Sequence, residues 1–154
     1  MTSFVNLKPR LDDPEVRRVR TLSMFQPPSP ESVERVIERC RRESRQLWGF
    51  EENGRVLGVV EYEIREEKIL YIAGIAVIEE RRNQGLGRAM LAALCEKHNL
   101  PIELETDDDA IGFYQKCNFT SEPFQQNGVQ RWKCKLTQSK LLATDDTDSH
   151  GCKK

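Results

Sequence analysis

The sequence lacks several features that would place the protein in other classes. No apolar run in it approaches the length of about 20 residues that a membrane-spanning helix needs. The apolar core of a secretory signal is also missing near its start. Its 24 basic and 25 acidic side chains nearly cancel, which gives no general attraction to nucleic acid or to a membrane surface. We therefore expect a cytoplasmic protein that binds neither nucleic acid nor membranes.

The cysteines give no sign of a metal site or of a disulfide framework. They are odd in number and form no Cys-x-x-Cys pair and no Cys/His ligand spacing, so we expect no metal ion and read them as reduced thiols. Cys40, Cys95 and Cys117 fall where a helix would turn them inward, which favours buried packing. Cys134 and Cys152 are the other two.

Two common phosphate-binding loops are also missing, since the chain has neither G-x-G-x-x-G nor G-x-x-x-x-G-K-[ST]. What it has is Arg-x-x-Gly-x-Gly at residues 82–87, after the apolar segment Ile69–Ile78 and before a helix with an apolar stripe. Backbone N–H groups and the helix dipole would point at one place there, which suits a phosphate. An ordinary tight connection between strand and helix explains the same six residues equally well.

The length of 154 residues and a hydrophobic content of 38% predict one domain with a real core. We expect a polar leader at 1–13, a domain at 14–136 and a polar, disordered tail at 137–154. The predicted strands are Val16–Phe25, Leu47–Phe50, Val56–Ile64, Ile69–Ile78, Ile102–Glu105, Phe119–Phe124 and Val129–Leu136, with Trp132 as a core anchor. The predicted helices start at Pro30, capped by Ser29, at Leu86, ended by Asn99, and at Ala110, ended by Asn118.

A second motif, Ala110-x-x-Phe113-Tyr114-x-Lys116-x-Asn118-Phe119, lies downstream of the glycine turn. Together the two motifs resemble the GNAT family of acyltransferases, which carry A-x-x-F-Y-x-K-x-G-F after the strand that follows the CoA helix. Asn118 replaces the usual glycine and keeps its left-handed option. The resemblance implies an α/β (α+β) fold, a single GNAT-like domain. Its mixed central β-sheet would have six to seven strands flanked by helices, with a splay between the central strand and the following parallel strand.

The resemblance implies acetyl-CoA as co-substrate and assigns residues to it. Backbone groups of Ile75, Ala76 and Val77 would bind the pantetheine arm and polarise the thioester. The turn residues Arg82, Asn83, Gln84, Gly85, Leu86 and Gly87 would hold the pyrophosphate, with Arg88 as a further contact. Asp107 matches a position that contacts the pantetheine arm.

The resemblance also implies that Tyr114 protonates the leaving thiolate, although an aromatic residue at helical spacing is more often part of the core. For a general base we consider Glu61, on the strand beside the central one, and Tyr71. Some enzymes of this type use no base, because the amine loses its proton to solvent before it binds.

The leading interpretation is an N-acetyltransferase that acts on a primary amine of a small molecule or peptide by direct attack in a ternary complex. Glu51, Glu61 and Glu63 hint at a cationic acceptor. The alternatives are a CoA-binding sensor without catalysis, and a toxin-neutralising or scaffolding protein on the same fold. The sequence is compatible with a homodimer.

Overall fold

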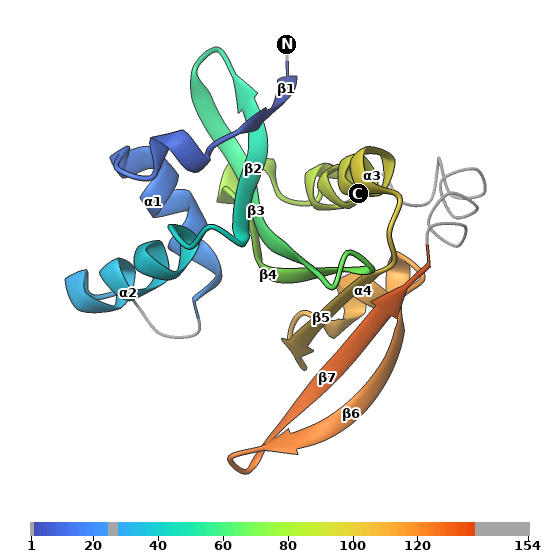
Figure 1. The fold of residues 1–154 in the computed structure, drawn as a ribbon. Coiled ribbons are helices and arrows are strands. Elements are labelled where there is room, and N and C mark those ends of the chain that lie inside the picture. Colours follow the sequence, from blue (N-terminus) through green and yellow to red (C-terminus); the bar gives the residue numbers. More distant parts are fainter. Residues whose placement is uncertain (1, 25–27, 138–154) are drawn as a thin grey trace.

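The computed structural model describes residues 2–24 and 28–137 (Figure 1). Its strands are β1 (Thr2–Asn6), β2 (Arg45–Glu52), β3 (Arg55–Arg65), β4 (Ile69–Val77), β5 (Ile102–Asp107), β6 (Thr120–Gln126) and β7 (Val129–Leu136). Its α-helices are α1 (Pro14–Arg20), α2 (Pro30–Cys40), α3 (Leu86–His98) and α4 (Ile111–Lys116). Short 3-10 helices are η1 (Lys8–Arg10), η2 (Thr21–Ser23) and η3 (Glu79–Arg81). No helix in the described ranges is long and apolar enough to cross a bilayer.

The seven strands form one mixed sheet in the order β1-β2-β3-β4-β5-β7-β6, so β4 is its middle strand as the sequence predicts. Every neighbouring pair is antiparallel except β4 and β5. These two strands pair only at Leu70 with Ile102 and at Tyr71 with Glu103, and beyond Tyr71 they diverge. The predicted splay is therefore confirmed.

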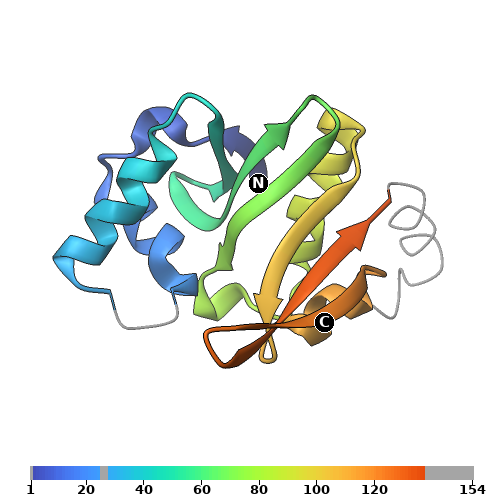
Figure 2. The same ribbon diagram turned by 60° about the horizontal axis from the view of Figure 1, so that its bottom comes forward.

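The sheet buries a different hydrophobic cluster on each face. One cluster joins α3 and α4 to the sheet, with Leu91, Leu94 and Tyr114 among its members. The other joins α1 and α2 to the sheet through Val19 and Ile37, and none of its buried residues comes from β5, β6 or β7. Figure 2 shows the consequence, because α1 and α2 lie beside the first strands while β5, β7 and β6 face the viewer with no described helix in front.

The N-terminal region differs from the sequence prediction. Val16–Phe25 was expected to be a strand, but residues 14–20 form α1 and residues 21–23 form η2. Asp13 explains the change, since its side chain accepts a hydrogen bond from the Glu15 N–H while Pro14 takes the first helical position. The strand of this region is β1, which lies inside the segment 1–13 and pairs with β2.

The predicted turns and caps are confirmed elsewhere. Both residues of the Asn53-Gly54 turn and both of the Asn127-Gly128 turn have positive φ, as tight hairpin turns require. Ser29 caps α2 by accepting a hydrogen bond from the Ser32 N–H at 3.1 Å. Trp132 is only half-buried and packs at the edge of the core, while its indole N–H bonds to Asp108 at 2.7 Å. The expected tail lies outside the described residues from 138 onward.

The end of α3 gives a test of the fold. Asn99 is exposed and adopts the left-handed conformation, with φ 55° and ψ 47°. Asn99→Ala should lower the free energy of unfolding by about 1 kcal/mol, because alanine lacks the short polar side chain with which asparagine tolerates the left-handed conformation. Asn99→Gly should not lower it, since glycine adopts this conformation without strain. Urea unfolding at 25 °C measures both changes. Equal stability of the alanine variant and the parent would contradict the assignment of this cap.

Candidate active site

A cavity of about 1060 Å³ lies between α3 and α4 on the face of the sheet that these helices cover. The C-terminal half of β4 forms its floor through Ile75 and Val77. The glycine turn before α3 borders it on one side, and Tyr114 of α4 on the other. The cavity therefore brings together the two motifs and the central strand.

The start of α3 directs unsatisfied backbone donors into this cavity. Gly85 caps the helix in the left-handed conformation at φ 83°, and no side chain caps the N-terminus. The first bond of the helix runs from the Ala89 N–H to the Gly85 carbonyl at 2.9 Å, so the N–H groups of Leu86 and Gly87 precede any intrahelical acceptor. With Arg81 and Arg82 beside the turn, this is an anion-binding arrangement.

The divergence of β4 from β5 supplies a second set of backbone groups. β4 pairs with β3 along its length, from Arg65–Ile69 to Gly58–Val77, but with β5 only up to Tyr71. Beyond that point the edge of β4 that faces β5 has no strand partner among the described residues. An extended chain with amide groups could bond there as an additional strand would.

The two motifs touch each other. A Cβ built on Gly87 would lie 3.0 Å from Cζ of Phe113, so the ring packs directly against the start of α3. Only a glycine at 87 allows this approach without a shift of the ring. The contact fixes α4 against the turn and sets the width of the cavity between them.

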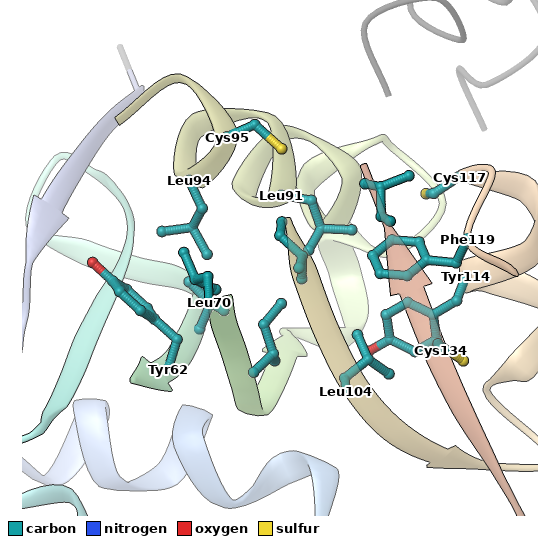
Figure 3. Packing of buried hydrophobic residues seen from close by; sticks show 14 of the residues in the cluster. Tyr62, Leu70, Leu91, Leu94, Cys95, Leu104, Tyr114, Cys117, Phe119 and Cys134 are labelled. Atoms are coloured by element: carbon teal, nitrogen blue, oxygen red, sulfur yellow. The ribbon is translucent and has the colours of Figure 1, made fainter. Parts of the chain in front are cut away.

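Tyr114 is 5% exposed and packs among core residues although it lines the cavity. Its ring lies edge-on to Phe113 and Phe119 at centroid distances of 4.9 and 5.4 Å. Figure 3 shows it in the cluster with Leu104 and Cys134. Burial raises the pKa of Tyr114 above that of a free phenol, and Cys134 and Asp107 add to the effect. The phenol therefore stays protonated at neutral pH.

The model of the acetyltransferase (GNAT) family matches residues 14–119, more than half of the chain. The chain belongs to the GNAT family. The match includes both motifs and every strand from β2 to β5. A search of curated protein sequences finds no significant match.

Solved structures show the same GNAT fold. A GNAT-family acetyltransferase from Desulfovibrio desulfuricans superposes with a TM-score of 0.73 at 21% identity, over 90% of this chain and 99% of that one. The ribosomal-protein-S18-alanine N-acetyltransferase of Escherichia coli gives 0.70 at 19%, over 88% and 93%. A GNAT acetyltransferase from Elizabethkingia anophelis with acetyl-CoA bound gives 0.65 at 18%, over 88% and 97%.

Most of the residues assigned to acetyl-CoA on sequence grounds line this GNAT cavity. They are Ile75, Ala76, Val77, Arg82, Asn83, Gly85, Leu86, Gly87, Arg88 and Tyr114. Gln84 and Asp107 do not line it. Gln84 bonds to the carbonyl of Glu80, and Asp107 accepts the Ala110 N–H at 3.0 Å and so shapes the turn before α4.

The cavity also has lining residues that the sequence prediction missed. They are Arg81, Asp109, Ala110, Gly112, Phe113, Gln115, Lys116, Cys117 and Asn118. Several belong to the second motif, so its spacing could have indicated them. Lys116 adds a cation at the cavity wall opposite the arginines of the turn. Among the described residues, no group of three or more Cys, His, Asp or Glu side chains is placed to hold a metal ion.

Glu61, the predicted base, lies outside this cavity with its side chain 1% exposed. Its Oε1 accepts a hydrogen bond from Arg20 Nε at 2.7 Å, and its Oε2 accepts one from Arg45. With both carboxylate oxygens held by guanidinium groups, the contacts favour a structural role. Its role as a base stays a prediction.

The acidic residues that hinted at a cationic acceptor are all neutralised. Glu51 pairs with Arg10 at 2.7 Å, and Glu63 pairs with Arg45 at 3.0 Å and Arg65 at 2.7 Å. Glu61 is held by Arg20 and Arg45, so each of these three carboxylates has a cationic partner within the chain. Arg10 and Arg45 are distant along the chain from the glutamates that they bind, so the sequence did not reveal these pairs. A cationic acceptor stays a prediction.

The buried ion pairs of Glu61 predict a large effect on stability. Glu61→Gln should lower the free energy of unfolding by about 3 to 5 kcal/mol, because Arg20 would keep a buried charge without its counter-charge. Glu63→Gln is the matched control and should lower it by less than about 1 kcal/mol, since its partner Arg65 is half exposed. Urea unfolding of both variants gives the comparison. Similar losses of unfolding free energy in the two variants would show that the burial of Glu61 does not determine the size of the effect.

Proposed function

We propose that the protein transfers the acetyl group of acetyl-CoA to a primary amine of a small molecule or peptide, by direct attack in a ternary complex. The observation that carries this proposal is that one cavity joins the glycine turn, the edge of β4 that no described strand pairs with, and Tyr114. Membership of the GNAT family and the acetyl-CoA bound to the Elizabethkingia anophelis structure support the choice of co-substrate.

The pyrophosphate of acetyl-CoA would bind at the start of α3. The N–H groups of Leu86 and Gly87 and the positive end of the helix dipole favour an anion there, and Arg82 adds a charge. The pantetheine amides would then bond to the free edge of β4 between Ile75 and Val77. This path leads the thioester from the turn to the point where β4 and β5 separate.

At that point the neutral amine attacks the thioester carbonyl carbon. A C–N bond forms, the C–S bond breaks, the amine loses its proton to solvent, and the sulfur leaves as a thiolate that takes up a proton. Backbone N–H groups of β4 would stabilise the developing oxyanion. The phenol of Tyr114 would donate its proton to the departing sulfur, and its raised pKa keeps that proton in place until negative charge develops.

A CoA-binding sensor without catalysis is the second candidate. It would need the turn before α3 but no phenol at the thioester. The placement of Tyr114 at the cavity wall favours the enzyme.

The glycine turn can be tested by binding alone. Gly85→Ala should weaken acetyl-CoA binding about tenfold, because alanine at φ 83° is strained by about 1 to 2 kcal/mol and the turn would relax away from its anion-binding shape. Gly54→Ala is the matched control, since its φ is 80° and a Cβ would likewise meet no atom within 4 Å. It should lose similar stability and keep full affinity. Isothermal titration calorimetry measures both, and unchanged affinity of Gly85→Ala would place the pyrophosphate elsewhere.

The phenol of Tyr114 can be tested by kinetics. Tyr114→Phe should lower kcat by about 10² to 10⁴-fold and leave the KM for acetyl-CoA nearly unchanged. The raised pKa predicts an equal loss at every pH from 6 to 9, because the phenol is protonated throughout. Tyr62→Phe is the control, since Tyr62 bonds to His98 and does not line the cavity. An unchanged kcat of Tyr114→Phe across this pH range would exclude Tyr114 as the acid.

A further inference from the structure

The face of the sheet opposite the cavity is where an acceptor can reach the thioester. α3 and α4 cover one face of the opening between β4 and β5, and the hydrophobic cluster of α1 and α2 stops at β4. Of the described residues, no helix covers β5, β7 and β6 on this second face (Figure 2). Side chains that border the opening on this face therefore meet the acceptor.

Arg20 borders the opening on the β4 side. Its guanidinium lies flat against Gly74, where an added Cβ would sit 2.6 Å from Cζ and from Nη2. Gly74 pairs with Glu61 across the sheet, next to the residues that would carry the thioester. The side chain of Arg20 bonds to Glu61 through Nε alone, so its two Nη groups have no acceptor in the described part of the chain.

Arg131 borders the opening on the other side. It pairs with Asp107 at the end of β5. Trp132 and Cys134, which lie one and three residues further along β7, pack on the α3/α4 cluster, and residues at odd separations along a strand point to opposite faces. Arg131 therefore projects to the second face. Its Nε is buried and has no hydrogen-bond partner within residues 2–24 and 28–137, and it forms no ion pair there. A buried guanidinium N–H without an acceptor is costly and gains free energy when a ligand supplies an anionic oxygen.

The carboxylates of this face near Arg131 include Asp107, its partner across the sheet, and Glu105. Glu61 and Glu63 are held by Arg20, Arg45 and Arg65. Glu105 is two residues before Asp107 on β5, shares its face, is exposed, and forms no ion pair with the described residues. Two guanidinium groups and the carboxylate of Glu105 around one opening match a ligand that carries both charges.

We propose that the acceptor is an amine that also carries a carboxylate, an amino acid, with the carboxylate bound by Arg131 and Arg20 and the ammonium group met by Glu105 before it loses its proton. This inference rests on the proposed acetyl transfer and names its acceptor class. It differs from the cationic acceptor that the acidic residues of the sequence suggested.

The test compares amino acids with the amines that remain when the α-carboxylate is removed. Alanine, glutamate, phenylalanine and lysine would each be paired with the corresponding decarboxylated amine, and thiol release from acetyl-CoA gives kcat/KM. The parent protein should prefer the amino acid in at least one pair by about tenfold or more, the range expected for charge-assisted hydrogen bonds. Equal or better use of the decarboxylated amine in every pair would overturn the inference and leave the acetyltransferase proposal intact.

Two variants distinguish binding of the carboxylate by Arg131 from a general effect of removing one positive charge. Arg131→Gln should lower kcat/KM for the preferred amino acid by about tenfold or more, mainly through KM, and leave kcat/KM for its decarboxylated partner unchanged. Lys135→Gln removes the same charge from an exposed position on the same strand and face that does not pair with Glu105, and should change neither value. Equal losses for both substrates with Arg131→Gln, or equal effects of the two variants, would overturn the inference.

Failure of the proposed function gives a different result. A protein that transfers acetyl groups to none of the amines, with or without a carboxylate, would overturn acetyl transfer and the acceptor class together. Calorimetry with acetyl-CoA would then distinguish a CoA-binding sensor, which binds it, from a protein that only shares the fold.

Discussion

The β-bulge in the middle strand is the constraint from which the site follows. Glu61 pairs with Gly74 and its neighbour Tyr62 pairs with Ile72, so Ala73 is the extra residue of β4. A bulge bends its strand and increases the local twist. Pairing with β5 ends at Tyr71, two residues before the bulge, and the strands separate from there. The opening, the free edge of β4 and access from both faces are consequences of this single irregularity.

The same bulge explains why charge is buried beside it. Gly74 has no side chain, so the guanidinium of Arg20 can lie against the strand, and Glu61 and Arg45 complete the cluster beneath α1. Buried ion pairs rarely add much stability compared with apolar residues, but removal of one partner is costly. The cluster therefore fixes α1 at one distance from β4. It holds this face of the sheet in place, whereas the cavity that we propose binds acetyl-CoA lies on the other face.

Local signals in the sequence were sufficient for much of the fold. Asn53-Gly54 indicates its hairpin because both residues tolerate positive φ, and the apolar run from Ile69 indicates a middle strand because both faces are covered. The glycine turn and the Phe113-Tyr114 motif indicated most of the cavity, because backbone geometry and spacing determine how they meet.

Contacts between distant residues were not predictable in the same way. Glu61 lies 41 residues from Arg20 and 16 from Arg45, so the pattern of β3 alone made it look like an available carboxylate. β1 is an edge strand whose pairing with β2 depends on the rest of the sheet, and the leader gave no periodicity for it. Residues 16–23 were assigned the wrong structure because the cap at Asp13 and Pro14 outweighed the β-branched residues among them. Phe25, the end of that predicted strand, lies outside the described residues.

The cysteines near the cavity bear on how the acetyl group moves. Cys117 lines the cavity, but it is 2% exposed, and Cys134 beside Tyr114 is 1% exposed. Burial raises the pKa of Cys134 to about 11, so it remains a thiol at neutral pH. A thiol is a poor nucleophile compared with a thiolate, and neither residue borders the acceptor face. An acetylated enzyme would therefore need a nucleophile that these cysteines do not supply, whereas an opening reached from both faces would let the amine of the proposed reaction attack the thioester directly.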